Sequence, residues 1–399
     1  SEYSQVEDRS FNILMIDDNS LNAFAAPGGV IGINGGLFLY AENEGQFASV
    51  LAHELAHLSQ RHFARNVLYS KDNNLASVLV MVSAMAAAVA TNNPNAFMAG
   101  PAFLQQQSLR YSRLFEREAD RVGFNNLINA QYDPSSMGEM FEQMAKMRRL
   151  AGDNIPEFLL THPISSSRVA DAFNAADQVE SQYSKKDSLD YQLIRGRLRI
   201  KYEEIPLNAI RKIQGIIKDD PSNENRYALA VAYKRGNKYQ DSLDMIDDLI
   251  NEHPKNLILQ NTKAEILLDK GDAEEALKIV NNALNISPKN FPLSVLKAKI
   301  LSYKKELFAA EEIIRDQLLR RNTDPYLWLY LSEIQRDSKN VVGYHRSRAE
   351  YFLLLGQYED ALNQLQFALK LTENNFQISE SIMTKINTTR KIIEGTRGQ

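Results

Sequence analysis

Residues 50–58 read Val-Leu-Ala-His-Glu-Leu-Ala-His-Leu, a His-Glu-x-x-His motif inside a run of good helix formers. With 3.6 residues per turn, His53 and His57 lie one turn apart on the same face of a helix. Two imidazoles at that spacing bind one zinc ion, and Glu54 beside them reaches the water next to the metal. The motif therefore predicts a zinc-binding helix that needs a further ligand from elsewhere in the chain.

The residues that follow the motif decide the subclass of zinc site. A metzincin would have Gly at position 60 and His at position 63, but this chain has Gln60 and Phe63 there. The metzincin subclass is therefore excluded. His62 comes nine residues after His53, and at ~100° per residue it faces the opposite side of a continuous helix. We expect His62 to lie at the surface.

Residues 111–123 predict a second helix, and this helix carries three carboxylates. Glu116 and Asp120 are four residues apart and share one face, whereas Glu118 points away from them. Alone, this pattern is typical of a charged surface helix. Beside a two-histidine site that lacks a ligand, a carboxylate on this helix is the better interpretation, and it gives a His₂Glu site with one open position. Asp120 is then placed to hydrogen-bond a ligating imidazole.

A turn within residues 158–168 contains Thr-His-Pro and a run of serines, before a helix that starts at about Ser166. A His-Pro pair in such a turn is usually structural, but His162 is the only other histidine in this half of the chain. A structural role and an approach to the metal therefore carry equal weight. His162 and Arg168 are both candidates to stabilise the oxyanion of peptide hydrolysis, and the sequence does not choose between them.

These residue types indicate hydrolysis of peptide bonds with one zinc ion per chain as the cofactor. Zinc lowers the pKa of bound water from 15.7 to about 7 and polarises the carbonyl group that is to be cleaved. We expect Glu54 to take a proton from water and to pass it to the leaving amine.

The segment before the motif predicts a small sheet. Residues 11–16 (Phe-Asn-Ile-Leu-Met-Ile) are typical of a short buried strand, and residues 30–33 are typical of a hairpin strand after a Pro-Gly-Gly turn. The glycines fit simple turn chemistry or, with equal weight, a strand whose bare backbone pairs with an extended peptide.

Leu75–Ala90 is the most apolar run of the chain, and it is 16 residues long. Crossing a bilayer takes ~20 apolar residues, so the favoured interpretation is a core helix or a helical hairpin packed on the catalytic part. The alternative is a hairpin beside the active site that faces a partner or makes peripheral contact with a membrane.

A period near 34 residues appears in the second half of the chain, with prolines at positions 221, 254 and 288. The clearest unit is residues 271–288, and its pattern of Gly, Ala and Leu returns at residues 356–371. Small residues allow paired helices to pack closely, and each proline ends the second helix of a pair. This is the tetratricopeptide pattern, with about four to six helix pairs.

The predicted fold class is α-rich (α+β), in two domains. Residues 1–183 form a gluzincin-type metallopeptidase domain with a small β-sheet. Residues 184–399 form an all-α tetratricopeptide solenoid, and the polar segment around residues 182–187 connects the two.

Composition excludes several other classes of protein. The chain has 399 residues, a net charge of −4 and no cysteine. Thiol nucleophiles, disulfides and zinc-thiolate sites are therefore excluded, and no basic stripe suggests a nucleic-acid partner. The chain starts with Ser and not with Met, so we expect a processed or trimmed chain from which targeting information has been removed.

Several motifs together resemble the zinc endopeptidase family that contains the CAAX prenyl proteases. They are His53-Glu-Leu-Ala-His57, Glu116-Arg-Glu-Ala-Asp120, Asn22-Ala-Phe-Ala-Ala-Pro-Gly-Gly29 and Thr161-His-Pro163. The resemblance covers essentially the whole chain and is most specific in the first half. It implies that His53, His57 and Glu116 bind zinc, that Glu54 is catalytic and that Asp120 supports a ligand.

The same resemblance implies a periplasmic protease of bacteria that acts on outer-membrane β-barrel proteins and their assembly machinery. A periplasmic protease without an obvious pro-segment needs a restraint. We predict that His162 binds or covers the zinc at rest, held by the Thr-His-Pro turn, and that substrate or partner binding displaces this turn.

Two other functions remain as alternatives. The repeats are typical of an adaptor or assembly chaperone that binds proteins on a concave surface, in which case the protease half would be vestigial or latent. The third interpretation is a membrane-bound protease that uses Leu75–Ala90 as its anchor.

Overall fold

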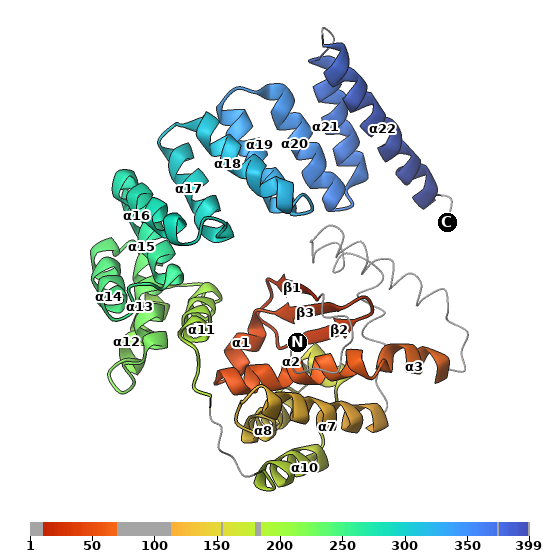
Figure 1. Cartoon of the computed structure of the whole chain (residues 1–399), viewed down its shortest axis with the longest axis vertical. Coiled ribbons are helices and arrows are strands. Elements are labelled where there is room, and N and C mark those ends of the chain that lie inside the picture. Colours follow the sequence, from red (N-terminus) through yellow and green to blue (C-terminus); the bar gives the residue numbers. More distant parts are fainter. Residues whose placement is uncertain (1–10, 70–112, 153–154, 180–184, 373–374, 398–399) are drawn as a thin grey trace. The chain divides into compact units, whose positions relative to one another are not determined.

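A computed structural model of the chain describes residues 11–69, 113–152, 155–179, 185–372 and 375–397. The described residues form two compact units, and the chain passes from one to the other between Ala228 and Leu229, within helix α13 (Asn223–Arg235). The first unit combines a three-stranded sheet with helices, and the second is entirely helical in its described part (Figure 1). The predicted α-rich fold class with one small sheet is confirmed. The domain boundary at residue 183 stays a prediction.

The sheet of the first unit consists of β1 (Asn12–Ile16), β2 (Ala23–Ala26) and β3 (Val30–Asn34), in the order β1-β3-β2. Strand β3 runs parallel to β1 and antiparallel to β2. A turn joins β2 to β3, and its Gly28 and Gly29 have φ angles of +85° and +75°, which residues with a Cβ rarely adopt. The glycines therefore have the turn role that the sequence allowed.

Two details of the predicted sheet are wrong. Strand β1 is not buried throughout, because only Leu14 and Ile16 point into the core while Ile13 and Met15 are 57% and 51% exposed. Strand β3 does not have a bare backbone, because it is central and pairs on both sides. An apolar strand at a sheet edge alternates between core and solvent, and this period of two was not visible in an all-apolar segment.

The helices of the first unit follow the sheet. They are α1 (Gly36–Tyr40), α2 (Glu44–Ser59), α3 (His62–Tyr69), α7 (Arg113–Asn129), α8 (Ser135–Leu150), α9 (Glu157–Thr161), α10 (Ser166–Asp177), α11 (Leu189–Lys201) and α12 (Pro206–Ile216). The predicted helix after the serine run is confirmed at Ser166, where Ser165 caps the first turn by accepting a hydrogen bond from the Arg168 backbone.

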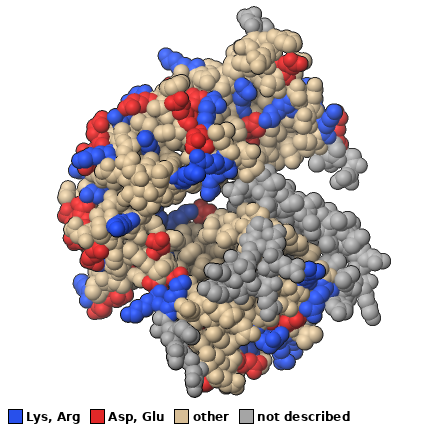
Figure 2. All heavy atoms as spheres, in the orientation of Figure 1, with Lys and Arg blue, Asp and Glu red and all other residues tan. Residues whose placement is uncertain are grey.

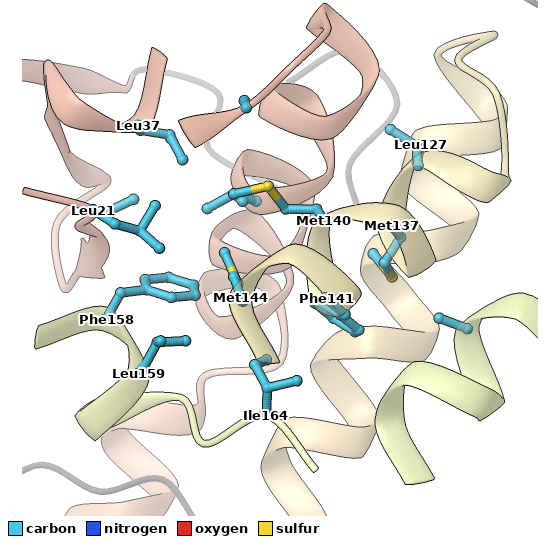
Figure 3. Close-up of a cluster of buried hydrophobic side chains, with 14 of the residues drawn as sticks. Leu21, Leu37, Leu127, Met137, Met140, Phe141, Met144, Phe158, Leu159 and Ile164 are labelled. Carbon is cyan, nitrogen blue, oxygen red and sulfur yellow. The ribbon is translucent and has the colours of Figure 1, made fainter. Parts of the chain in front are cut away.

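The core of this unit is built around α8. Met137, Met140 and Met144 are essentially inaccessible to solvent, and they pack with residues from the sheet, α2 and α7. Phe158 and Leu159 of the short helix α9 enter the same cluster (Figure 3). Burying side chains of this size stabilises the fold by about 1.5–3 kcal/mol each. This short helix is thereby anchored, and the turn that follows it starts from a fixed point.

Paired antiparallel helices make up the rest of the chain. They are α13, α14 (Tyr239–Glu252), α15 (Leu257–Lys270), α16 (Ala273–Ile286), α17 (Phe291–Tyr303), α18 (Leu307–Arg320), α19 (Pro325–Asp337), α20 (Val341–Leu354), α21 (Tyr358–Lys370) and α22 (Phe376–Arg397). Pro254 and Pro288 lie just past the ends of α14 and α16, as the repeat pattern predicts. Ala276 and Ala361 are fully buried where neighbouring helices pack.

The surface and the apolar segment bear on possible partners. On the face drawn in Figure 2, lysines and arginines are interspersed with acidic residues, without a basic stripe. Within the described ranges, every helix is too short or too polar to cross a membrane. The predicted hairpin at Leu75–Ala90 lies outside the described residues.

Candidate metal centre

Helix α2 carries the His-Glu-x-x-His motif, and its start is well defined. Asn43 caps the first turn, since its side chain accepts a hydrogen bond of 2.8 Å from the backbone of Gln46. Further along the helix, His53, Glu54 and His57 are all at most 2% exposed. Buried polar side chains need hydrogen-bond or metal partners. This face of the helix is therefore expected to contact other polar groups and not only the apolar core.

Helix α7 packs directly against α2, and Gly123 makes the approach possible. A Cβ at this position would lie 3.0 Å from the backbone nitrogen of His53 and 3.1 Å from the carbonyl of Ala52. Few side chains tolerate contacts this close to a backbone that cannot move aside. Two turns earlier on α7, Glu116 then faces His57, with 3.3 Å between its Oε1 and the Nε2 of His57.

Four potential metal ligands converge from three segments: His53, His57, Glu116 and His162. One ligand atom from each lies within 4.8 Å of all the others, and all four side chains are buried. The Nε2 atoms of His53 and His57 are 3.0 Å apart, and the Nδ1 of His162 is 3.0 Å from Glu116 Oε1 and 3.4 Å from His53 Nε2. The two histidines of the motif therefore lie next to Glu116 of α7 and His162 of the Thr-His-Pro turn.

The spacing of these atoms fits a zinc ion. In a tetrahedral site with metal–ligand distances of about 2.0–2.1 Å, the ligand atoms lie ~3.3–3.4 Å from one another. With Glu116 Oε1 as the carboxylate atom, four of the six atom pairs of this group are separated by 3.0, 3.0, 3.3 and 3.4 Å. Imidazole nitrogens and one carboxylate oxygen are also donor types that zinc prefers. The residues present therefore fit the metal in both number and chemistry.

Arg168 and Asp120 hold the ligands from behind. The Nδ1 of His53 is 3.0 Å from Asp120 Oδ1. Arg168 donates to both carboxylate oxygens of Asp120 at 2.7 Å and to Glu116 Oε2 at 2.8 Å. Burial alone would raise the pKa of Asp120, but hydrogen bonds and charges from His53 and Arg168 outweigh it and lower the pKa. Asp120 is therefore a carboxylate at neutral pH and can accept a hydrogen bond from His53 Nδ1.

His162 is as buried as the motif residues, at 2% exposed. Its Nε2 lies 3.6 Å from Glu54 Oε1, while its other nitrogen faces Glu116. Burial would lower the pKa of His162, but the negative charges of Glu116 and Glu54 outweigh it and raise the pKa. His162 thus lies between the carboxylate of Glu54 and the other candidate ligands.

Glu54 is 1% exposed, and its Oε1 has no hydrogen-bond partner among the described residues. Its carboxylate accepts a hydrogen bond from the backbone of Ala25 in β2. Burial is the main reason that the pKa of Glu54 is raised. A carboxylate whose pKa is raised is a stronger base toward water than an ordinary glutamate.

Comparison with known proteins identifies the first half of the chain. Residues 2–176 match the model of Peptidase family M48. This part of the chain belongs to that family. The predicted zinc cofactor is confirmed, since M48 metallopeptidases use zinc and the M48 part carries a group positioned to bind a metal ion. The resemblance that the motifs indicated is confirmed as well.

Relatives of the M48 part extend into the repeats. The beta-barrel assembly-enhancing protease of Escherichia coli (strain K12) is 28% identical over 90% of this chain and 74% of its own length. A Vibrio cholerae relative is 32% identical over 62% of this chain and 52% of its own length. The chain thus spans about half of the latter. Among solved structures, a thermophilic TPR protein of Thermus thermophilus is 17% identical, covers 51% of this chain and 98% of its own, and has a TM-score of 0.31.

The expectation that His62 lies at the surface of the M48 part is wrong. His62 is fully buried, and its Nδ1 lies 2.9 Å from Nδ1 of His57. The prediction assumed one continuous helix, but α2 ends at Ser59 and Arg61 has a φ of +52° before α3 begins at His62. This break redirects the chain and brings His62 to the Nδ1 side of His57, behind the candidate ligand group. No signal in the sequence marks it, because Arg is an uncommon residue for a left-handed turn.

Proposed function

We propose that the chain is a zinc-dependent endopeptidase in which His53, His57 and Glu116 hold one zinc ion. The observation that carries the proposal is the convergence of buried ligand atoms within 4.8 Å of one another, next to Glu54. The family match of residues 2–176 supports the same reaction. Protein or peptide chains are the substrates.

Glu54 is the proposed general base. Bound zinc supplies a Lewis acid that acidifies water and polarises the carbonyl group of the substrate. Glu54 accepts a proton from the attacking water through its unpaired Oε1 and delivers it to the leaving amine. Its raised pKa supports the first transfer, because a carboxylate with a higher pKa is a stronger base toward water.

Strand β2 is the proposed docking edge for the substrate. Among the described residues, β2 pairs with β3 on one side only, and its Ala25 backbone contacts Glu54. An extended peptide that adds to this edge would bring its backbone past the catalytic carboxylate, with hydrogen bonds to main-chain groups and little dependence on side chains. Strand addition, which the sequence allowed for the strand at residues 30–33, is therefore assigned to β2.

His162 is the proposed restraint of the resting enzyme. Its ring fills the fourth ligand position and lies 3.6 Å from Glu54 Oε1, in the space that the attacking water needs. Arg168 supports this closed state by donating a hydrogen bond of 2.9 Å to the carbonyl of Pro163. Substrate or partner binding has to displace the Thr-His-Pro turn before hydrolysis. Arg168 and His162 then become available as oxyanion partners.

The relatives support a proposal for the setting of the reaction. The Escherichia coli protein that covers most of this chain is named for the assembly of β-barrels. We extend this to the present chain as a periplasmic enzyme that acts on outer-membrane β-barrel proteins, with the repeats recruiting clients or assembly machinery. The alternative of an adaptor with a vestigial protease is not favoured, since every residue of the proposed zinc site is present.

The Glu54→Gln variant tests the proposal. It removes the proton acceptor but no zinc ligand, so we expect one zinc ion per chain and a loss of casein hydrolysis of at least about 10²-fold. Glu312→Gln, the same change on α18 of the repeats, is the matched control and keeps full activity. Zinc content comes from elemental analysis and activity from fluorescent casein.

Hydrolysis by zinc-loaded Glu54→Gln at the wild-type rate would refute the base assignment, and an inactive wild type would favour the adaptor.

A further inference from the structure

His62 and Glu118 form a second chain of contacts behind the zinc site. The Nδ1 of His62 lies 2.9 Å from Nδ1 of His57, and its Nε2 lies 3.1 Å from Glu118 Oε2. Glu118 is in turn held by Arg65, whose Nη1 donates to the same oxygen at 2.9 Å. These contacts run away from the ligand group, from a candidate zinc ligand to a half-buried carboxylate.

The direction of each hydrogen bond follows from the first one. In the proposed site His57 presents Nε2 to the zinc, so its proton is on Nδ1 and this nitrogen can only donate. Nδ1 of His62 must then accept. A neutral imidazole that accepts at one nitrogen carries its proton on the other, so Nε2 of His62 donates to Glu118. The three side chains have one consistent arrangement of protons.

We propose that His62 and Glu118 are positioning residues that fix the tautomer and the ring orientation of His57. This inference rests on the proposed function, because it takes His57 as a zinc ligand. The ring of His62 is restrained further by stacking on Phe115, with ring centroids 4.7 Å apart and planes 14° from parallel. The acceptor that faces His57 therefore has little freedom to turn.

The two histidines of the motif are thus held differently. His53 has a carboxylate beside it, with 3.0 Å between its Nδ1 and Asp120 Oδ1, and Arg168 donates to the same oxygen. His57 donates to a neutral imidazole, and the negative charge of Glu118 acts one residue further away. Partners of this kind raise the basicity of a ligating imidazole, and their removal typically weakens metal binding about 10–100-fold. The break at Arg61 is what places His62 here, since a continuous helix would direct it to the opposite face.

The test compares two substitutions of His62 in the full chain. His62→Phe keeps a ring that can stack on Phe115 but has no acceptor, and we expect zinc affinity about 10–100-fold weaker. His62→Gln keeps an amide oxygen for His57 and an amide N–H for Glu118, and we expect affinity within a few-fold of wild type. Arg65→Gln is the matched control, because it removes a contact of Glu118 and leaves the hydrogen bonds of His57 and His62 intact.

Zinc affinity is measured by competition with a chromophoric chelator, and the urea midpoint of each metal-free variant is measured alongside. A merely structural role of His62 would lower the metal-free midpoint of both substitutions and leave zinc affinity unchanged in the folded protein. Glu118→Leu gives an independent arm if His62→Phe does not fold, with a loss of about tenfold expected. Wild-type zinc affinity in Glu118→Leu or in folded His62→Phe would overturn the proposal.

A separate variant distinguishes this outcome from a failure of the proposed function. His57→Ala removes the ligand itself and is expected to bind zinc far more weakly than His62→Phe. Zinc binding that is lost in His57→Ala but unchanged in His62→Phe would reject only the positioning role. Zinc binding that is unchanged in His57→Ala would reject the metal site and, with it, the proposed function.

Discussion

One guanidinium, that of Arg168, connects the ligands with the turn that covers them. Arg168 is 5% exposed and donates to Asp120, Glu116 and the carbonyl of Pro163. Burial alone would lower the pKa of Arg168, but the charges of Asp120 and Glu116 raise it, so the group stays charged. Of these contacts of Arg168, displacement of the Thr-His-Pro turn breaks only the one to Pro163. The contacts of Arg168 to Asp120 and Glu116 can therefore persist in the proposed open state.

His162→Ala is expected to raise peptide hydrolysis on the order of tenfold, because a resting state closed by this ring leaves only a small fraction of molecules open. The initial rate on fluorescent casein at equal zinc loading gives the measurement. Ser166→Ala, at the exposed start of α10, is the control and stays at the wild-type rate. A variant that loses zinc and activity together would instead make His162 a permanent ligand.

Glu157 gives a prediction for the pH dependence of stability. Burial and the nearby charge of Asp18 raise its pKa above 4.5, and its Oε1 has no partner among the described residues. The folded state holds this proton more tightly than the unfolded state, so the stability that Glu157 contributes in its protonated form is lost as pH rises through the raised pKa. Glu157→Gln keeps an acceptor for Asn22 without the charge.

We therefore expect Glu157→Gln to be more stable than wild type near pH 7 and to differ little near pH 4. Urea unfolding of both proteins at the two pH values measures this difference. The comparison between variants cancels the contribution of other titrating groups. An advantage of the variant that is equal at both pH values would contradict the assignment to Glu157.

At the residue scale, spacing alone predicted which residues of the candidate site share a helix face. The four-residue intervals from His53 to His57 and from Glu116 to Asp120 each select one helix face, and the structure brings these two faces together. His62 was missed because the face rule holds only within an unbroken helix. The positive φ of Arg61 is a property of the folded backbone. It was not predictable because the residue there is not Gly or Asn, which commonly adopt positive φ.

At the scale of elements, the packing of α7 on α2 determines whether a carboxylate reaches the histidines. Glu116 sits about two helical turns before Gly123, so a small change in the distance between the helices moves it relative to His57. The core cluster under α8 supports both helices and α9 together (Figure 3). The positions of the candidate ligands therefore depend on this packing.

Gly123→Ala is expected to destabilise the first unit by about 1–3 kcal/mol, because its Cβ would press on the backbone of Ala52 and His53. Zinc affinity should fall with it, since Glu116 moves away. The matched control is Gly215→Ala in α12, whose Cβ meets nothing within 4 Å and which should gain about 0.5–1 kcal/mol. Urea unfolding and chelator competition measure both effects. Equal stability of the two variants would refute the argument from close packing.

Helix boundaries were predictable where local chemistry sets them. Helix α10 starts at Ser166, as the serine run predicted. The central place of β3 was not predictable, because strand order depends on pairing between segments and not on the strand's own residues. A chain that is apolar at almost every position from 30 to 33 fits a central strand or an edge strand equally well.

At the scale of the whole molecule, the two compact units predict two separable unfolding transitions. The four candidate metal ligands all belong to the unit that ends at Ala228. Removing zinc should lower the transition of that unit only, by about 2.7 kcal/mol if free zinc was at 100 times its dissociation constant. Differential scanning calorimetry with and without chelator measures this. His57→Ala is the control, in which chelator should change neither transition.

A shift of both transitions on chelation would show that the units unfold together. The repeats themselves were predictable from their period, because each proline and each buried alanine recurs at a fixed place in the helix pair. The sequence does not identify the natural protein substrate, and the proposed substrate class rests on the name of a relative.

The proposed ligands come from three distant segments: His53 and His162 are 109 positions apart, and Glu116 lies 46 positions before His162. No continuous peptide shorter than the longer interval contains the whole set. A chain that has been synthesised only as far as residue 161 therefore lacks one of the proposed ligands, and an unfolded chain does not hold the ligands together. The proposed enzyme can hydrolyse peptide bonds only after these long-range contacts have formed. Its unfolded chain is therefore inactive, which prevents premature cleavage.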